Sequence, residues 1–239
     1  MKLRMAEAVL EAKMSLQERP EFMVKLMAIE GAGPEVAERI RAEVHVDFPI
    51  SSFDLDLDQL RLIVEKLPPV QSATLRVRPG GVLEVGIIER TPALVWRRPE
   101  GLGLIDVEGN LVSGLDKRAD RADLPLVVGE GAHHAAEEAL ELMMAAAPIA
   151  DRVRGLRRMG ERRWDVVLDR DQVIQLPEEA PVRALERVIL LDKAQELLAR
   201  DITHVDLRNP RRPTLRLAQS SLEELHNIRG LEFGVNVNE

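Results

Sequence analysis

The sequence predicts an α+β fold with two domains, a small one and then a larger, mostly antiparallel β domain. Two helical patterns interrupt the strand-like runs before residue 90, whereas many short strand-like runs, separated by Gly, Pro and Asp, follow residue 92. A chain of 239 residues with 45% hydrophobic content can build two cores. We therefore expect a helical segment over 1–21, a small domain over 22–90 and a β domain over 91–239 that ends in a helix.

The small domain is expected to have the element order β-α-α-β-β, with both helices on one face of a three-stranded sheet. Pro34 opens the first helix, where its missing N–H is harmless, and Asp56 with Gln59 caps the second. Pro79-Gly80-Gly81 supplies the left-handed geometry of a hairpin turn. In chain order, the expected elements are a helix over 1–18, a strand over 22–31, helices over 34–44 and 53–67, and strands over 70–78 and 82–90.

The segment "IERTPALVW" (88–96) is expected to lead directly from one domain into the next. Glu89-Arg90-Thr91-Pro92 contains no residue that favours the positive φ of a hairpin turn. Pro92 cannot donate to a sheet and biases Thr91 toward an extended conformation. The chain therefore leaves the small domain straight, through a stiff joint.

The β domain is expected to contain short strands and two long helices. Glu108-Gly109 and their neighbours form a hairpin turn, and Pro181 opens the second long helix. The expected strands are 93–98, 102–106, 111–112, 124–131, 152–159, 163–170, 172–177, 203–208 and 214–218, and the expected helices are 133–147, 181–200 and a last one that Ser221 with Glu224 caps and Gly230 ends.

Composition excludes several classes of function. The net charge is -8, from 33 basic and 41 acidic residues, so a field that would gather nucleic acid is missing. The chain has no Cys and hence no disulfide, thiolate metal site or Cys nucleophile. No apolar run approaches the roughly 18 residues of a membrane helix, and no signal-peptide core is present, so we expect a soluble chain as given.

No catalytic motif is found, and we expect no enzyme, cofactor or metal. The alternative is a metal-dependent enzyme, because His134 and Glu138 lie four residues apart on a helix, as do His133 and Glu137. Two ligands make a poor site, and no third ligand lies near them in sequence. A solvated helix start is the favoured interpretation of this segment.

Other conspicuous residues are expected to be structural. Trp96 and Trp164 lie in strand patterns, where aromatic side chains pack well, and are expected in the core. The basic segment "RVRGLRRMGERR" (152–163) could meet an acidic partner. The favoured interpretation is that its basic residues alternate outward on strands while three apolar residues, Val153, Leu156 and Met159, face inward.

The last β-pair is the most informative region. In "TLRLA" (214–218), Leu215 and Leu217 point to one face and Thr214 and Arg216 to the other, which is typical of a half-buried strand. No strand follows, so this strand is expected at a sheet edge, where a partner could add a strand of its own. About four ladder hydrogen bonds, at roughly 0.5 to 1.5 kcal/mol each, fall short of the ~8 kcal/mol of a micromolar complex. Side chains must therefore act as anchors, and the nearest candidates are Leu217, Arg208 and the helix at 181–200.

From about residue 22 to 218, the chain resembles the FtsQ/DivIB family of bacterial cell-division proteins. The resemblance lies in the order and spacing of "IEGA" before a helix, "FDLDLDQLRLIVEKLPPVQSATLRVRPGGVLEVGIIERTPALVW", "GLGLIDVEGNLV", "LPLVVGEGA" and the late "HVDLR". It implies a POTRA domain for the β-α-α-β-β unit and a family protein with a cytoplasmic tail, one membrane helix and two domains on the periplasmic face of the inner membrane. Residues 1–21 would then be the juxtamembrane segment.

The resemblance also implies a function and a site. Family members are non-enzymatic scaffolds of the divisome at the septum; the β domain binds an FtsB–FtsL pair through its last strand, and the POTRA domain serves recruitment to other septal proteins. Arg208 matches the family's arginine after "VDL", and Asn209 and Leu217 stand where some members have aromatic residues. The implied binding residues are Arg208, Asn209, Thr214, Leu215, Arg216, Leu217 and Ala218, with either Arg183 or Arg187 as a helix arginine that holds an acidic partner residue.

A POTRA-bearing adaptor in outer-membrane protein assembly or secretion is the runner-up function. Repeated POTRA units or a transmembrane barrel would favour that function. The sequence shows one such unit and no barrel pattern.

Overall fold

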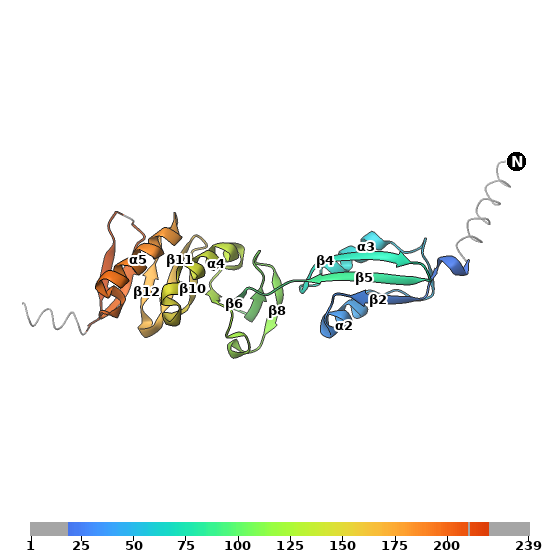
Figure 1. Ribbon diagram of the computed structural model, residues 1–239, viewed down its shortest axis with the longest axis horizontal. Helices are drawn as coiled ribbons and strands as arrows, with labels where there is room; N and C mark the ends of the chain where they lie inside the picture. Colours follow the sequence, from blue (N-terminus) through green and yellow to red (C-terminus); the bar gives the residue numbers. More distant parts are fainter. Residues whose placement is uncertain (1–18, 210, 220–239) are drawn as a thin grey trace, which may run out of the picture. The chain divides into compact units, whose positions relative to one another are not determined.

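The computed structural model describes residues 19–209 and 211–219. The chain divides into two compact units, Met1–Thr91 and Pro92–Glu239, each with its own elements (Figure 1). The helices expected over 1–18 and after Ser221 lie outside the described residues. No helix within the described ranges combines the length and apolarity that crossing a membrane requires.

The first unit is built on a three-stranded sheet in the order β2-β5-β4. β5 runs parallel to β2 and antiparallel to β4, and a short pair, β1 with β3, adds a feature that the sequence did not predict. The elements are a 3-10 turn at Pro20–Phe22, β1 (Met23–Val24), β2 (Leu26–Glu30), α2 (Pro34–Glu43), β3 (Ile50–Ser51), α3 (Leu57–Glu65), β4 (Val70–Arg78) and β5 (Val82–Glu89).

Both helices of the first unit cover the same face of its sheet. Alternate residues of β5, among them Leu83 and Val85, are fully buried in one core with Ile40 of α2 and Val64 of α3. The predicted cap is present, because the Asp56 carboxylate accepts a hydrogen bond from the Gln59 amide at 2.9 Å. The order β-α-α-β-β expected from the periodic patterns is therefore observed, with the β1–β3 pair inserted.

β4 ends in a glycine turn, and a side chain binds one amide of its outer edge. Gly80 and Gly81 adopt φ values of 95° and 78°, as the tight hairpin between β4 and β5 requires. At the outer edge of β4, the amide of Ala73 donates to the Glu65 carboxylate of α3 at 3.1 Å. A side chain of the same unit thus occupies one of the N–H groups that an edge strand leaves open.

The second unit contains a nine-stranded, mostly antiparallel sheet in the order β14-β13-β12-β11-β10-β9-β6-β7-β8. The pairs β6–β9, β9–β10 and β12–β13 are parallel. The strands and α-helices are β6 (Leu94–Arg98), β7 (Gly101–Ile105), β8 (Leu111–Leu115), β9 (Leu126–Val128), α4 (Ala136–Ala145), β10 (Val153–Met159), β11 (Arg163–Leu168), β12 (Val173–Gln175), α5 (Pro181–Gln195), β13 (Ile202–Asp206) and β14 (Thr214–Leu217).

One face of this sheet is covered by α4 and α5 (Figure 1). Leu156, Val166 and Ile174 lie opposite one another on neighbouring strands, and all three are fully buried in a core with Leu142 of α4 and Leu185 of α5. Trp164 is fully buried in this core, as expected, and its indole N–H donates to the Glu138 carboxylate at 2.8 Å. Trp96 is half-buried at the margin of the same core.

The basic segment 152–163 differs from its expected pattern. The register of β10 against β11 shifts between Val153 and Gly155, and this bulge lets both Val153 and Leu156 face the core. The expectation that Met159 also faces inward is wrong: Met159 lies opposite Arg163, three residues from Leu156 and hence on the other face of a strand with a two-residue period.

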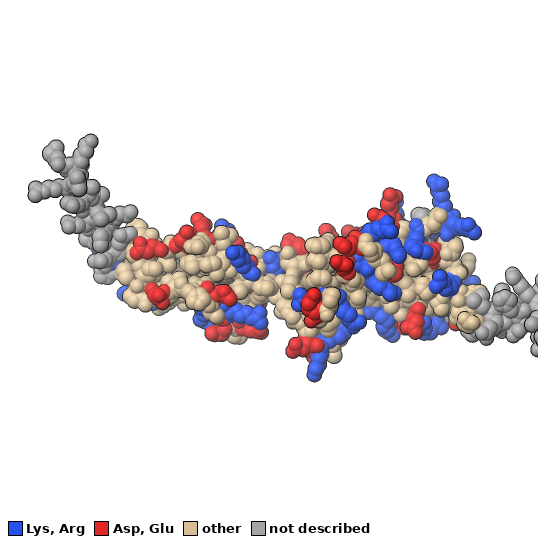
Figure 2. Space-filling model, turned by 180° about the vertical axis from the view of Figure 1, so that it is seen from behind, with Lys and Arg blue, Asp and Glu red and all other residues tan. Residues whose placement is uncertain are grey.

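The arginines of this segment were also expected to alternate outward, and Arg158 does not: it lies opposite Trp164 on the core face and pairs with Glu138. Arg163 lies on the outer face, opposite Met159, where it is mostly buried and pairs with Asp165. Arg152 precedes β10 and pairs with Asp169. Arg157 is exposed on the face away from the helices, with Arg97 in the same cross-strand row. Seen from behind, Lys and Arg side chains gather over the second unit (Figure 2).

Candidate partner-binding edge

Within the described ranges, β14 is the last strand of the nine-stranded sheet and pairs only with β13. Opposite residues are Thr214 with Asp206, Leu215 with Val205, Arg216 with His204 and Leu217 with Ile202. In the part of the chain that the structure describes, no other strand lies along the outer side of β14.

The backbone groups that face outward belong to Leu215 and Leu217. The Ala218 amide donates to the Asp201 carbonyl at 3.0 Å, so the backbone of Ala218 faces β13. Successive residues of a strand direct their N–H and C=O groups to opposite sides. Thr214 and Arg216 therefore face β13 as well, and the four N–H and C=O groups of Leu215 and Leu217 form the open edge.

The side chains of β14 are less buried than a half-buried strand predicts. Leu217 is partly buried against the main core, whereas Leu215 is 48% exposed, although its neighbour Val205 is buried. Thr214 and Arg216 are exposed. Leu215 lies at the margin of the sheet, where no further strand of the described ranges covers it, so it offers an apolar contact beside the open backbone groups.

Arg208 is held in place by an acidic neighbour that the sequence interpretation missed. The guanidinium of Arg208 donates to both carboxylate oxygens of Asp206, at 2.6 to 3.0 Å, and the Arg208 amide donates to the same carboxylate. The guanidinium holds the pKa of Asp206 below its ordinary value, and the carboxylate raises the pKa of Arg208. The Arg208 side chain nevertheless remains 52% exposed, so its outer face is accessible.

Asp206 continues a polar row across the face of the sheet that the helices leave uncovered. In this row Asp206 lies opposite Gln175, which lies opposite Asp165. Asp165 is buried, which raises its pKa, and it accepts a hydrogen bond from Arg163 at 2.9 Å. The row brings the Asp206–Arg208 ion pair next to the edge strand, on the same face as Thr214.

The remaining predicted site residues have different surroundings. Asn209 is part of its own loop, where its side-chain oxygen accepts from the Arg211 amide at 3.1 Å. Arg183 and Arg187 lie one turn apart on the exposed side of α5. Arg183 lines a groove between α4 and α5, together with Glu141. Among the described contacts, none joins either helix arginine to β14.

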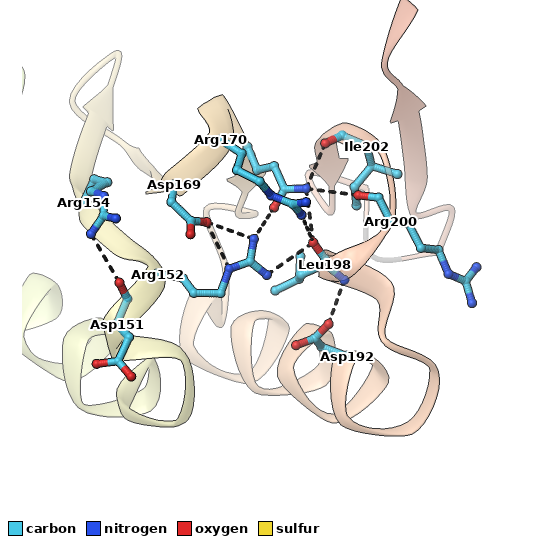
Figure 3. Close-up of polar contacts among 10 residues, drawn as sticks. Asp151, Arg152, Arg154, Asp169, Arg170, Asp192, Leu198, Arg200 and Ile202 are labelled. Carbon is cyan, nitrogen blue, oxygen red and sulfur yellow. Dashed lines mark hydrogen bonds and ion pairs between the residues drawn. The ribbon is translucent and has the colours of Figure 1, made fainter. Parts of the chain in front are cut away.

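A buried polar network fixes the connection from α5 to β13 (Figure 3). The side-chain amide nitrogen of Gln172 donates to the carbonyl oxygens of Leu198, Arg200 and Ile202 at 3.0 to 3.3 Å. Arg152 donates to the Gln172 side-chain oxygen at 2.6 Å and also to Asp169. The network therefore sets the point at which β13 begins, and β13 supports the edge strand.

Glu138, one of the two residues of the alternative metal site, is engaged in other contacts. The Glu138 carboxylate accepts hydrogen bonds from Arg158 at 2.6 Å and from Trp164 at 2.8 Å. His133 and His134 lie in a 3-10 turn before α4, where their rings contact each other. Across the described ranges, no three His, Asp or Glu side chains form a group that could hold a metal ion.

Comparisons with known proteins agree on one family. Residues 94–208 match the sequence model described as cell division protein FtsQ/DivIB, C-terminal. Three relatives, each named cell division protein FtsQ, span most of the chain. The protein of Roseobacter litoralis is 52% identical over 93% of this chain and 76% of its own length. The protein of Cereibacter sphaeroides is 52% identical over 91% and 71%, and that of Rhizobium meliloti 29% identical over 84% and 65%.

Sheet architecture and sequence matches together define a bacterial cell-division protein of mixed α and β structure. The resemblance found in the sequence is confirmed: this chain belongs to the FtsQ family.

Proposed function

We propose that this chain is a non-enzymatic scaffold of the divisome that binds an FtsB–FtsL type partner by strand addition to β14. The observation that carries the proposal is the open outer side of β14, where Leu215 and Leu217 direct four backbone groups away from β13. An extended partner segment can satisfy these groups with ladder hydrogen bonds. Strand addition would continue the nine-stranded sheet into the partner.

Side-chain anchors must supply part of the affinity. Four ladder bonds contribute about 2 to 6 kcal/mol in total, less than the ~8 kcal/mol that micromolar binding needs. Leu215 offers an exposed apolar side chain next to the open amides. Arg208 offers a guanidinium that Asp206 has already oriented, so little side-chain entropy is lost when an acidic partner residue approaches.

We further propose that the first unit is a POTRA domain that links the partner complex to other septal proteins. Its order β-α-α-β-β and its single helix-covered sheet face support this assignment. Residues 1–21 would follow a membrane helix in the full-length protein, at the periplasmic face of the inner membrane and at the septum. Arg183 and Arg187 remain the proposed helix contacts for an acidic residue of the partner.

The experiment measures by calorimetry how tightly the Leu215→Pro and Leu215→Ala variants bind a purified FtsB–FtsL coiled-coil fragment from the same organism. Proline removes an outward N–H, whereas alanine keeps that N–H and removes only the apolar contact. We expect proline to weaken binding at least about tenfold more than alanine does, since it removes a ladder hydrogen bond and leaves the partner's carbonyl group unsatisfied.

Circular dichroism serves as the control for folding in both variants. Because the Leu215 amide faces away from β13, proline there should leave the fold of the second unit unchanged. Equal affinities for the proline variant and the unmodified chain would rule out strand addition at β14.

A further inference from the structure

The side chains of β14 give its open edge one apolar and one polar face. Leu215 and Leu217 lie opposite residues of the main core, so they face the side of the sheet that α4 and α5 cover. Thr214 and Arg216 alternate with them and face the uncovered side. A strand added to β14 continues both faces, because side chains that lie beside one another on adjacent strands point the same way. Its residues must therefore suit two different surfaces in alternation.

Arg216 is a cation without an acidic neighbour in its own cross-strand row. Its side chain is exposed, and its neighbour on β13 is His204. Beyond His204 the row continues to Val173 on β12, which is buried. The next row holds Asp206, but that carboxylate pairs with Arg208 and leaves Arg216 without an ion pair among the described residues. The Arg216 guanidinium is therefore available to a residue of an added strand.

The last β-pair is basic, although the whole chain has a net charge of -8. Residues 202–218 contain one acid, Asp206, and four arginines: Arg208, Arg211, Arg212 and Arg216. Two exposed acids, Glu178 and Glu179, follow β12, so four arginines still face three acids. These two acids lie beyond the Asp206 end of the strands, whereas Arg216 lies on the other side of that row. The surface beside Arg216 thus favours an acidic residue of the partner.

We propose that the segment added to β14 alternates acidic and apolar residues, with an acid beside Arg216 and an apolar residue beside Leu215. The alternation rests on the proposed strand addition and deepens it, because it assigns the chemistry of the partner segment and makes Arg216 a residue that selects the register. A slip by one residue would place the acid beside Leu215 and the apolar residue beside Arg216. Both contacts would then be lost, so the alternation holds the partner in one register.

An antiparallel added strand would approach most closely at Arg216. Leu215 and Leu217 direct their backbone groups outward and would form hydrogen-bonded pairs with it. Arg216, between them, would form a non-hydrogen-bonded pair, in which the Cα atoms are about 4.5 Å apart rather than about 5.5 Å. Opposite charges in such a pair stabilise a sheet and like charges destabilise it, so this position discriminates between partner residues by charge.

The test measures by calorimetry how tightly the full chain with Arg216→Glu binds the FtsB–FtsL coiled-coil fragment. The reversal replaces an attraction by a repulsion, so we expect binding about fivefold weaker than that of the unmodified chain. Arg212→Glu, the same change of charge at an exposed loop position, should weaken binding less than about twofold. An equal loss in both variants would overturn a contact at Arg216. Circular dichroism checks the fold, and Arg216→Gln, with an expected loss of about twofold, replaces Arg216→Glu if the spectrum changes.

Exchange of charges identifies the partner residue. Each acid of the partner segment is changed to Lys in turn, and one of these changes should restore binding of Arg216→Glu to within about twofold of the unmodified pair. A residue next to this acid in the partner segment should be apolar, and its change to Asp should weaken binding of the unmodified chain. Absence of a restoring acid, or a restoring acid with polar residues on both sides, would overturn the proposed alternation.

Leu215→Pro separates failure of the alternation from failure of strand addition. If Leu215→Pro weakens binding and Arg216→Glu does not, strand addition at β14 stands and the alternation is wrong. If neither change weakens binding, strand addition at β14 is wrong as well.

Discussion

Arg208 is held by Asp206 and yet keeps half of its side chain exposed. Such a guanidinium is oriented before a partner arrives and still has donors to offer, since the Asp206 carboxylate engages only Nε and one terminal nitrogen. This geometry supports the proposed role of Arg208 as an anchor for an acidic partner group at the end of the edge strand.

Charge reversal of Arg208 tests this anchor. Arg208→Glu places a second carboxylate beside that of Asp206 and repels an acidic partner residue, so we expect about tenfold weaker binding of the FtsB–FtsL fragment at low salt. The loss should shrink as salt rises, because exposed charges are screened. Affinities at two ionic strengths measure both effects. Arg211→Glu, the same change in the neighbouring exposed loop, is the control, and an equal effect there would contradict a specific role of Arg208.

At this scale, sequence reasoning found Arg208 but not its neighbour. Arg208 was singled out as a cation near the last strand and by its position after "VDL", whereas the pairing with Asp206 depends on how the chain turns after β13. An acidic and a basic residue two positions apart at a strand end could indicate such an ion pair, but in many such cases the two side chains point in different directions. The side-chain partners of Gln172 are still less predictable, because three carbonyl oxygens from a distant loop meet one amide.

At the scale of elements, the edge strand depends on the connection that precedes β13. Gln172, Arg152 and Asp169 join the β11–β12 turn to the backbone between α5 and β13. The hydrogen bond from Arg152 holds the pKa of Asp169 below its ordinary value. A carboxyl group whose pKa is lower in the folded state contributes stability above its unfolded pKa of about 3.9.

Asp169→Asn should therefore change how stability depends on pH. Near neutral pH we expect the variant to be less stable than the unmodified chain, since the ion pair with Arg152 is lost. The difference should vanish as pH falls through the lowered pKa of Asp169, where the carboxyl group of the unmodified chain is protonated. Urea unfolding of both proteins at pH 7 and at about pH 3 measures this difference in the free energy of unfolding. A difference that stays constant over this range would exclude the ionised pair as its cause.

Most elements could be predicted from periodicity and turn residues. α3 with its Asp56 cap and the hairpin at Gly80 follow from local rules. The bulge near Val153 could not be predicted, because it depends on the pairing of β10 with β11, and it is what separates Val153 and Leu156 from Met159. The low burial of Leu215 also depends on its place in the sheet rather than on its own sequence pattern.

At the scale of the whole molecule, the chain has separate cores in its two units. One core joins α2, α3 and the three-stranded sheet, and another joins α4, α5 and the nine-stranded sheet. Both tryptophans, Trp96 and Trp164, belong to the second unit. Fluorescence therefore reports unfolding of the second unit, whereas far-ultraviolet circular dichroism reports both.

Separate cores predict separate unfolding transitions. Val85→Ala in the first core should cost about 1 to 3 kcal/mol and shift part of the dichroism curve in urea while leaving the fluorescence midpoint unchanged. Leu156→Ala in the second core is the matched change, and it should shift the fluorescence midpoint. A fluorescence midpoint that moves with Val85→Ala would show that the two units unfold together.

The carboxylate of Glu65, bound to the Ala73 amide, has a consequence for assembly. A foreign segment that approached β4 at this point would have to displace the carboxylate that already accepts from the Ala73 amide, and this hydrogen bond would be lost before a new one formed. This hydrogen bond therefore disfavours strand pairing between two copies of the first unit along β4. Crowded copies of the protein would therefore be hindered from pairing edge to edge through β4 at this position.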